Sequence, residues 1–116
     1  MPTKESLEGI VISGRGEGKK YIEVYRDRIK DKIGFYPYLG TLNLKVDEIP
    51  DLDYDVIRGF WDYGGVKLAP CKIKGVAAYV VVPEKSRYKN VLELLSSSNL
   101  RTTLNLNDGD SVRVDF

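Results

Sequence analysis

The segment TLNLKV, residues 41–46, alternates polar and apolar side chains and gives the first indication of the fold. In a β-strand its three apolar residues would share one face, while Thr41, Asn43 and Lys45 would share the other. This alternation is typical of a strand that covers a core on one side and meets solvent on the other. We therefore expect a fold that contains β-sheet.

Further short stretches rich in β-branched residues also predict strands. Glycine, proline and turn signals such as NDGD at residues 107–110 separate them. The acidic residues 47–55, which include a proline, are expected to form a loop. The predicted strands cover residues 7–13, 21–25, 66–68, 71–73, 76–82 and 111–116.

Short helices are expected between the strands. In residues 26–33 two isoleucines lie four apart and would form one apolar helical face, with Gly34 suited to end the helix. Residues 90–95 (NVLELL) are rich in leucine, with Asn90 as a possible N-cap, and residues 100–104 would add one more turn. The chain is thus predicted to be mainly β: a small β-barrel with short inserted helices.

The composition narrows the class of protein. With 116 residues the chain fits one domain, 1–116, and 42% hydrophobic residues are enough for a packed core. Eighteen basic and 17 acidic residues leave a net charge of +1. That balance gives no bulk electrostatic reason to expect nucleic acid or an anionic membrane as a partner. The sequence does not determine the oligomeric state, for which we expect a monomer.

Cysteine and histidine usage narrows the chemistry. Cys71 is the one cysteine, so no internal disulfide can form, and a reducing, cytoplasmic location is expected. No stretch resembles a signal peptide or approaches the roughly 20 apolar residues that span a bilayer. Histidine is absent, which excludes histidine bases, Ser-His-Asp triads and zinc sites built on histidine.

A glycine-rich stretch, GRGEGK at residues 14–19, follows the first predicted strand. Three glycines at alternate positions would let backbone N–H groups converge on an anion, and Lys19 could add a charge for phosphate. We expect no long helix directly after it, so it matches neither the phosphate-binding loop nor the dinucleotide fingerprint. Taken alone, the stretch is more typical of a hairpin turn.

Four further groups of side chains could carry chemistry. Thr41 and Asn43 offer neutral oxygens for Mg²⁺, or are the solvent face of an ordinary strand. Glu93 could accept a proton from an alcohol, or is the polar face of the helix predicted over residues 90–95. The serines at 96–98 and the polar residues after them could grip a phosphate or end a helix. The loop aromatics could stack on a flat ligand or pack against the core: Tyr36, Tyr38, Trp61 and Tyr63.

The order of these motifs resembles the archaeal CTP-dependent riboflavin kinase family. The resemblance rests on SGRGEGKKY, then GFYPYLGTLNLKV, then VVPEKSRY, VLEL, NLR and LNLNDGDSVRV, and runs from about residue 8 to the C-terminus. Residues 47–70 are its least diagnostic part. It implies a six-stranded cradle-loop β-barrel and transfer of the γ-phosphate of CTP to riboflavin, giving CDP and FMN.

The resemblance also implies roles for particular residues. Thr41 and Asn43 would hold Mg²⁺, Glu93 would be the catalytic carboxylate, and Ser86 and Glu93 would contact the flavin. Ser86 stands where the family usually has threonine, and serine keeps the hydroxyl group. The nucleotide would be bound by Gly14, Arg15, Gly16, Glu17, Gly18, Lys19, Ser98, Asn99, Leu100 and Arg101.

Two other functions fit parts of the pattern. A non-catalytic barrel that senses a flavin or nucleotide would have no need of the metal pair or of Glu93. A nucleic-acid-binding barrel would use the tyrosines, but the net charge near zero disfavours it. Some members of the family carry a helix-turn-helix domain and act as regulators. We expect no such domain here.

Overall fold

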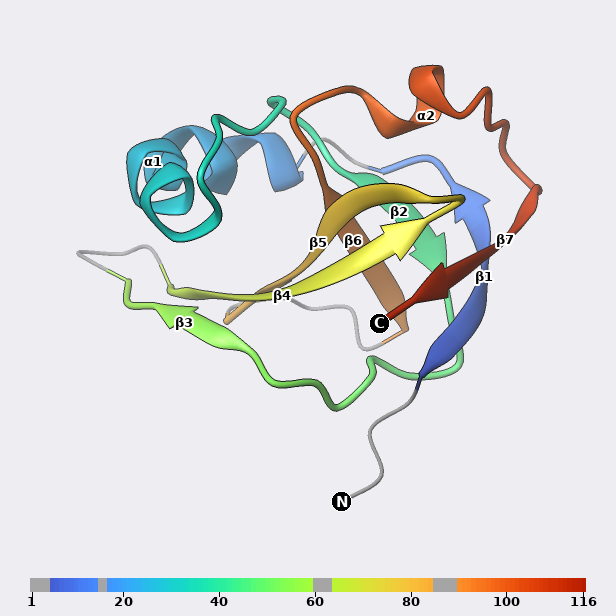
Figure 1. Cartoon of the computed structure of the whole chain (residues 1–116), viewed down its shortest axis with the longest axis horizontal. Helices are drawn as coiled ribbons and strands as arrows, with labels where there is room; N and C mark the ends of the chain where they lie inside the picture. Colours follow the sequence, from blue (N-terminus) through green and yellow to red (C-terminus); the bar gives the residue numbers. More distant parts are fainter. Residues whose placement is uncertain (1–4, 15–16, 60–63, 85–89) are drawn as a thin grey trace.

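The computed structural model describes residues 5–14, 17–59, 64–84 and 90–116 (Figure 1). Strands dominate this part of the chain, as the alternating segments predicted. The elements in order are β1 (Ser6–Ile12), α1 (Glu17–Ile33), β2 (Leu42–Lys45), β3 (Asp55–Ile57), β4 (Val66–Ile73), β5 (Val76–Pro83), β6 (Val91–Leu95), α2 (Leu100–Thr103) and β7 (Ser111–Asp115).

The strands form one antiparallel sheet that closes on itself. Its order is β3-β4-β5-β6-β2-β1-β7, and β7 also pairs with β4 through Val114 and Ile73. Among the described residues, six strands therefore complete a ring, while β3 pairs with the N-terminal half of β4. The predicted six-stranded barrel is confirmed, with β3 as an additional strand outside the ring.

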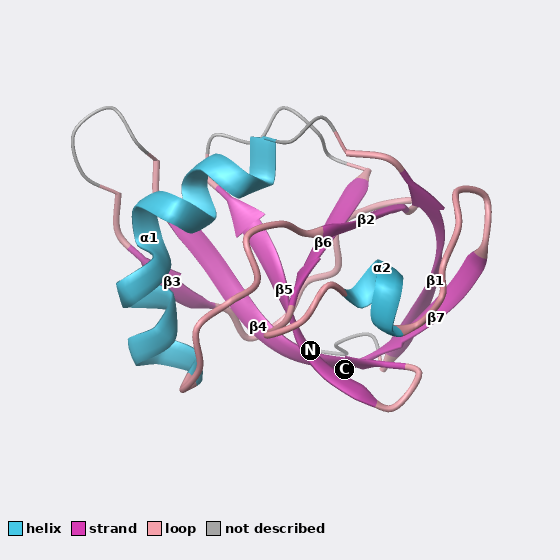
Figure 2. Ribbon diagram, turned by 90° about the horizontal axis from the view of Figure 1, so that it is seen from above, coloured by secondary structure: helices cyan, strands magenta, loops and turns pink. Residues whose placement is uncertain are grey.

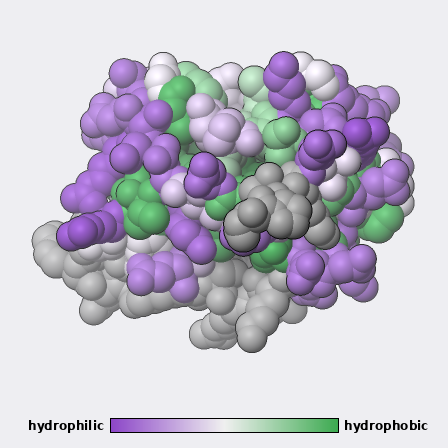
Figure 3. Space-filling view, turned by 60° about the horizontal axis from the view of Figure 1, so that its bottom comes forward, coloured by the Kyte–Doolittle hydropathy of each residue, from purple (hydrophilic) through white to green (hydrophobic). Residues whose placement is uncertain are grey.

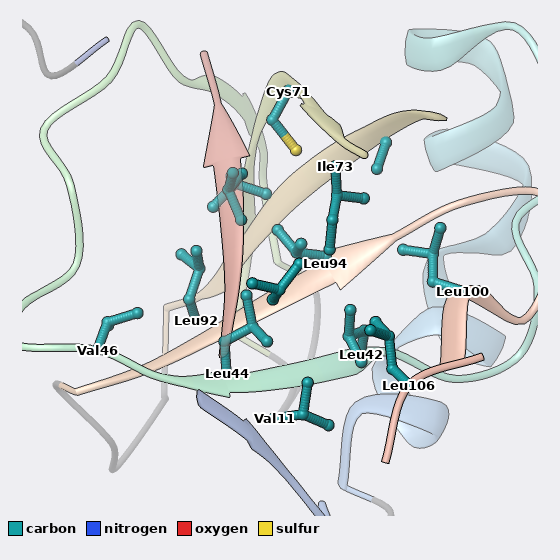
Figure 4. Close-up of a cluster of buried hydrophobic side chains, with 14 residues drawn as sticks. Val11, Leu42, Leu44, Val46, Cys71, Ile73, Leu92, Leu94, Leu100 and Leu106 are labelled. Carbon is teal, nitrogen blue, oxygen red and sulfur yellow. The ribbon is translucent and has the colours of Figure 1, made fainter. Parts of the chain in front are cut away.

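The inside of the ring is filled by apolar side chains from every strand that closes it. Val11, Leu44, Leu92 and Leu94 are fully buried there and converge in Figure 4. Leu100 from α2 joins the same cluster. Because successive side chains of a strand point to opposite faces, this packing leaves the residues between them on the outside of the barrel.

Helix α1 covers part of the outside (Figures 1 and 2). Ile22, Tyr25 and Ile29 are fully buried and pack in one cluster with Val81 and Leu95 of the barrel. Their spacing of three and four residues is that of one helical face. The second cluster gives the barrel wall apolar contacts on both sides beneath α1.

The strand predicted over residues 21–25 is therefore wrong, and the helix predicted over 26–33 begins nine residues earlier, at Glu17. The sequence YIEVY favours a strand by composition, because tyrosine, isoleucine and valine all do. Packing against the barrel wall outweighs that preference. The predicted end is confirmed, since Gly34 has a φ of 90° and its N–H donates to Lys30 O at 2.7 Å.

The helix predicted over residues 90–95 is also wrong, because Val91–Leu95 forms strand β6. Leu92 and Leu94 face the barrel interior, and Leu95 faces the cluster under α1. A strand that is buried on both sides loses the clean alternation of apolar and polar residues. Its leucines then favour a helix when the segment is considered alone.

The stretches predicted separately at residues 66–68 and 71–73 form one strand, β4. Pro70 lies between the part of β4 that pairs with β3 and the part that pairs with β7. A residue without an N–H is tolerated where the neighbouring strand changes. The other expected strands, the turn at 107–110 and the helical turn near residues 100–104 are confirmed within a residue or two at each end.

On the face shown in Figure 3, hydrophilic side chains surround smaller hydrophobic areas. This is expected where the apolar side chains gather inside a barrel and beneath a helix. Within the described ranges, no helix combines the length and the apolar character that a membrane crossing requires.

Candidate functional site

Two of the predicted site residues are direct neighbours on the outside of the barrel. Asn43 of β2 pairs with Glu93 of β6, and the same row of partners continues to Ile12 on one side and Val81 on the other. Direct cross-strand partners share a face, so the amide and the carboxylate lie side by side. Both side chains are half-buried.

Thr41 completes a cluster of oxygen atoms at this place. Its Oγ1 lies 3.3 Å from Asn43 Oδ1 and 3.2 Å from Glu93 Oε1, within hydrogen-bond reach of both. A hydroxyl has one proton, so it can donate fully to one acceptor at a time. The predicted metal pair and the predicted catalytic carboxylate thus form one site, although Glu93 lies on a strand and not on the helix we expected.

This oxygen set suits a hard cation. Mg²⁺ binds oxygen ligands, usually through a few protein groups, and takes the rest of its shell from water and phosphate. Within the described residues, no group of three His, Cys, Asp or Glu side chains is placed to hold a metal ion. A cation here would therefore depend on the neutral oxygens of Thr41 and Asn43, with the Glu93 carboxylate beside them.

The glycine-rich stretch begins directly against this cluster. A Cβ added at Gly14 would overlap the Asn43 amide and lie 3.1 Å from Asn43 Cγ. Helix α1 then begins at Glu17, so the second half of the stretch is helical and Lys19 is an exposed residue of α1. The expectation that no long helix follows was wrong. Arg15 and Gly16 lie outside the described residues.

A long helix in this position changes the chemistry that the stretch can support. The first N–H groups of a helix have no partner within it, and the aligned peptide dipoles favour an anion at that end. A flexible glycine segment that leads into a helix N-terminus is a common arrangement at phosphate sites. Here the helix begins at Glu17, three residues after Gly14, which lies against Asn43.

The second predicted nucleotide segment lies beside the loop before β2. Tyr38 N–H donates to Ser96 O at 2.8 Å, and Asn99 Nδ2 donates to the Tyr38 hydroxyl at 3.2 Å. Asn99 also caps α2 by accepting from Thr102 N–H. Tyr38 is 44% exposed, so its ring is open to solvent next to this segment.

The members of the second segment differ in what they offer a ligand. Ser98 Oγ accepts a hydrogen bond from Thr103 Oγ1 at 3.2 Å. The Leu100 side chain is 3% exposed and belongs to the barrel core, so only its backbone can face a nucleotide. Arg101 extends to the turn before β7, where its guanidinium lies 2.6 Å from Asp108 Oδ1.

Asp108 and Ser13 lie beside these segments, and the sequence did not single them out. Ser13 Oγ donates to Asp108 Oδ2 at 2.7 Å, across 95 positions of the chain. No periodicity or motif connects residues so far apart. Ser86, Trp61 and Tyr63, which the sequence did single out, lie outside the described residues.

Comparison with known proteins identifies the family of the chain. Residues 11–116 match the family model named for CTP-dependent riboflavin kinases and described as domain of unknown function DUF120. The riboflavin kinase of Thermoplasma volcanium is 41% identical over 94% of this chain and 56% of its own length. That of Pyrobaculum aerophilum is 44% identical over 95% of this chain and 60% of its own length.

The chain therefore spans little more than half of the length of these relatives. The family match nevertheless covers residues 11–116 of the chain. These include the glycine-rich stretch and the three residues of the oxygen cluster. The chain belongs to the CTP-dependent riboflavin kinase domain family.

Proposed function

We propose that this chain transfers the γ-phosphate of CTP to the 5′-hydroxyl of riboflavin, giving CDP and FMN. One observation carries the proposal: Thr41, Asn43 and Glu93 form a single oxygen cluster against Gly14, at the start of the glycine-rich stretch. The names of the relatives support a riboflavin kinase. The name of the family supports CTP as the phosphate donor.

The phosphates of CTP would lie where the glycine-rich stretch leads into α1. Backbone N–H groups at the N-terminus of α1, together with the helix dipole, would supply positive potential there. Lys19 adds a mobile charge on the exposed face of the same helix. Ser98, Asn99 and Arg101 would contact the rest of the nucleotide from the second segment.

Thr41 and Asn43 would hold the Mg²⁺ ion that accompanies the nucleotide. Bound there, the ion would neutralise charge on the outer phosphates as the γ-phosphoryl group is transferred. Asn43 is fixed by β2, whose backbone pairs with β1 and β6 on both sides, and Thr41 directly precedes that strand. Ligands on a central strand keep their positions better than ligands on a loop.

Glu93 would accept the proton of the riboflavin 5′-hydroxyl. The 5′-oxygen then forms a bond to the γ-phosphorus, the bond from that phosphorus to the bridging oxygen breaks, and CDP leaves with its electrons. Glu93 is half-buried and 3.2 Å from Thr41 Oγ1, so its carboxylate would lie beside the transferring phosphate. Ser86, together with Glu93, would contact the flavin.

The test is to incubate the protein with riboflavin, Mg²⁺ and each of the four common nucleoside triphosphates, and to measure FMN by chromatography. FMN should form with CTP well above a control without protein. If no triphosphate gives FMN, but the protein binds flavin or nucleotide, the chain is a non-catalytic sensor barrel. If ATP is used as well as CTP, the kinase activity stands and the donor preference is wrong.

A further inference from the structure

One carboxylate connects the two segments that we assign to the nucleotide. Asp108 Oδ2 accepts a hydrogen bond from Ser13 Oγ at 2.7 Å, and Asp108 Oδ1 lies 2.6 Å from a terminal nitrogen of Arg101. Ser13 is the residue before Gly14, which contacts Asn43. Arg101 belongs to α2, in the second segment.

Backbone hydrogen bonds fix the place of this carboxylate. Val11 N–H donates to Asp110 O, and Gly109 N–H donates to Val11 O, both at 2.8 Å, so the turn at residues 107–110 is held against the end of β1. Asn107 N–H donates to Asp110 Oδ2 at 2.8 Å and closes the turn. The backbone at Asp108 is therefore held in place by the turn, and only its short side chain has to be ordered.

The ion pair between Arg101 and Asp108 contributes little to the stability of the fold. The side chains of Arg101 and Asp108 are 37% and 55% exposed, and exposed ion pairs add little to the free energy of unfolding. The pKa of Asp108 is lowered from its ordinary value of 3.8, first by the hydrogen bond from Ser13 and then by the one from Arg101. The carboxylate thus stays ionised and keeps both partners at neutral pH.

Holding a long side chain in place before a ligand arrives reduces the entropy that binding would otherwise cost. Arginine has many rotamers, and a single fixed acceptor removes most of them. The same carboxylate also orients the serine from which the glycine-rich stretch departs. Both segments are then ordered relative to each other through one residue that neither contains.

We propose that Asp108 is a positioning residue for the nucleotide. It acts through Arg101 and Ser13, and holds the two nucleotide segments in place relative to each other before CTP binds. The inference rests on the proposed function for the identity of the ligand. Asp108 has no contact with the Thr41, Asn43 and Glu93 cluster among the described contacts, so its effect should fall on nucleotide binding and leave flavin binding unchanged.

The test compares Asp108→Asn with a matched control, Asp115→Asn. Asp115 pairs with Arg113 on β7 at 2.9 Å, and this ion pair is exposed in the same way but lies outside both nucleotide segments. Calorimetric titration with Mg²⁺ and CDP gives the dissociation constant without turnover. Steady-state kinetics with CTP and riboflavin give the two KM values separately.

Asp108→Asn should raise the dissociation constant of CDP and the KM of CTP by about three- to tenfold, while the KM of riboflavin stays within about twofold. Asp115→Asn should match the wild type in all three. Ser13→Ala, which removes one of the two hydrogen bonds, should give a smaller change in the same direction. In an Arg101→Ala background, Asp108→Asn should add less than it does alone.

Equal affinity for CDP in Asp108→Asn and wild type would overturn the inference. A rise in the KM of riboflavin as large as the rise in the KM of CTP would overturn it too. If Asp108→Asn does not fold, the dissociation constant of CDP and the KM of riboflavin are compared between Ser13→Ala and the wild type instead. A wild-type protein that binds CDP but forms no FMN would refute the proposed reaction alone, since the binding comparison still stands. A wild-type protein that does not bind CDP would refute both.

Discussion

Asn43 and Glu93 are direct partners across β2 and β6, with both side chains on the outer face of the barrel. The register of the sheet therefore sets their separation. A slip of one residue would turn both into the core and bring Leu42 or Leu44 to the outside, so core packing and site geometry depend on the same register.

Glu93→Gln keeps the size of the side chain and removes its charge and basicity. If Glu93 accepts the proton of the flavin hydroxyl, turnover should fall by about 10²-fold. Riboflavin affinity should change by no more than roughly tenfold, or about 1.4 kcal/mol. Single-turnover kinetics and a riboflavin fluorescence titration measure the two quantities. Undiminished turnover would leave Glu93 as a neighbour of the proposed metal ligands without a role in proton transfer.

Thr41→Val and Asn43→Leu each remove an oxygen from the proposed metal site with little change in volume. Turnover should fall by at least ~10-fold in each, and the Mg²⁺ concentration for half-maximal rate should rise. Thr41→Ser is the matched control, because it keeps the hydroxyl and should retain the Mg²⁺ dependence of the wild type. If both valine and leucine variants behave like the wild type over a Mg²⁺ titration, the metal lies elsewhere.

Gly14→Ala tests the contact between the glycine-rich stretch and Asn43. The added methyl group would overlap the Asn43 amide, which is the mobile end of a side chain and can move away. The fold should therefore survive, with a melting temperature within a few degrees of the wild type, while turnover falls by about tenfold because Asn43 is displaced. Wild-type turnover in Gly14→Ala would mean that the position of this amide does not matter.

Cys71 should be protected from thiol reagents in the folded protein. Its side chain is 6% exposed in the barrel core, and burial raises the pKa of the thiol from 9.0 to about 12. Since the thiolate is the reactive form, labelling at pH 8 should be slow until a denaturant is added. Fast labelling of the native protein would contradict the barrel packing around β4.

The same burial predicts a fall in stability at high pH. Above pH 9 the thiol of the unfolded chain loses its proton, while the buried thiol keeps it until about pH 12, so the unfolded state becomes favoured as the pH rises. Tyr54 acts in the same direction, because burial and then Asp51 raise its pKa from 10.0 to about 12. In urea titrations at several pH values, Cys71→Ala should show a shallower decline than the wild type.

Elements with one buried face were predictable from the sequence. TLNLKV alternates because Leu42 and Leu44 face the core while Asn43 does not, and this pattern predicted both the strand and the polar outer face. The family resemblance predicts roles for Thr41, Asn43 and Glu93. The three side chains lie together in the structure, and their roles stay predictions.

The remaining elements could not be read from local pattern. β6 is covered on both sides, so its leucines give no alternation, and α1 is helical against the preference of YIEVY because Ile22 and Tyr25 pack on the barrel wall. The link from Ser13 to Asp108 joins residues 95 positions apart. Contacts of that kind depend on the closed ring of strands, which local propensity does not contain.

The oxygen cluster of Thr41, Asn43 and Glu93 is proposed to serve phosphoryl transfer from CTP to riboflavin. Phosphorus-31 NMR on the protein with CTP, riboflavin and Mg²⁺ follows the transferred group directly. The γ-phosphate signal of CTP should disappear while signals of CDP and of the FMN phosphate monoester grow in equal amounts. Appearance of CDP with inorganic phosphate and no FMN, or no loss of CTP at all, would contradict it.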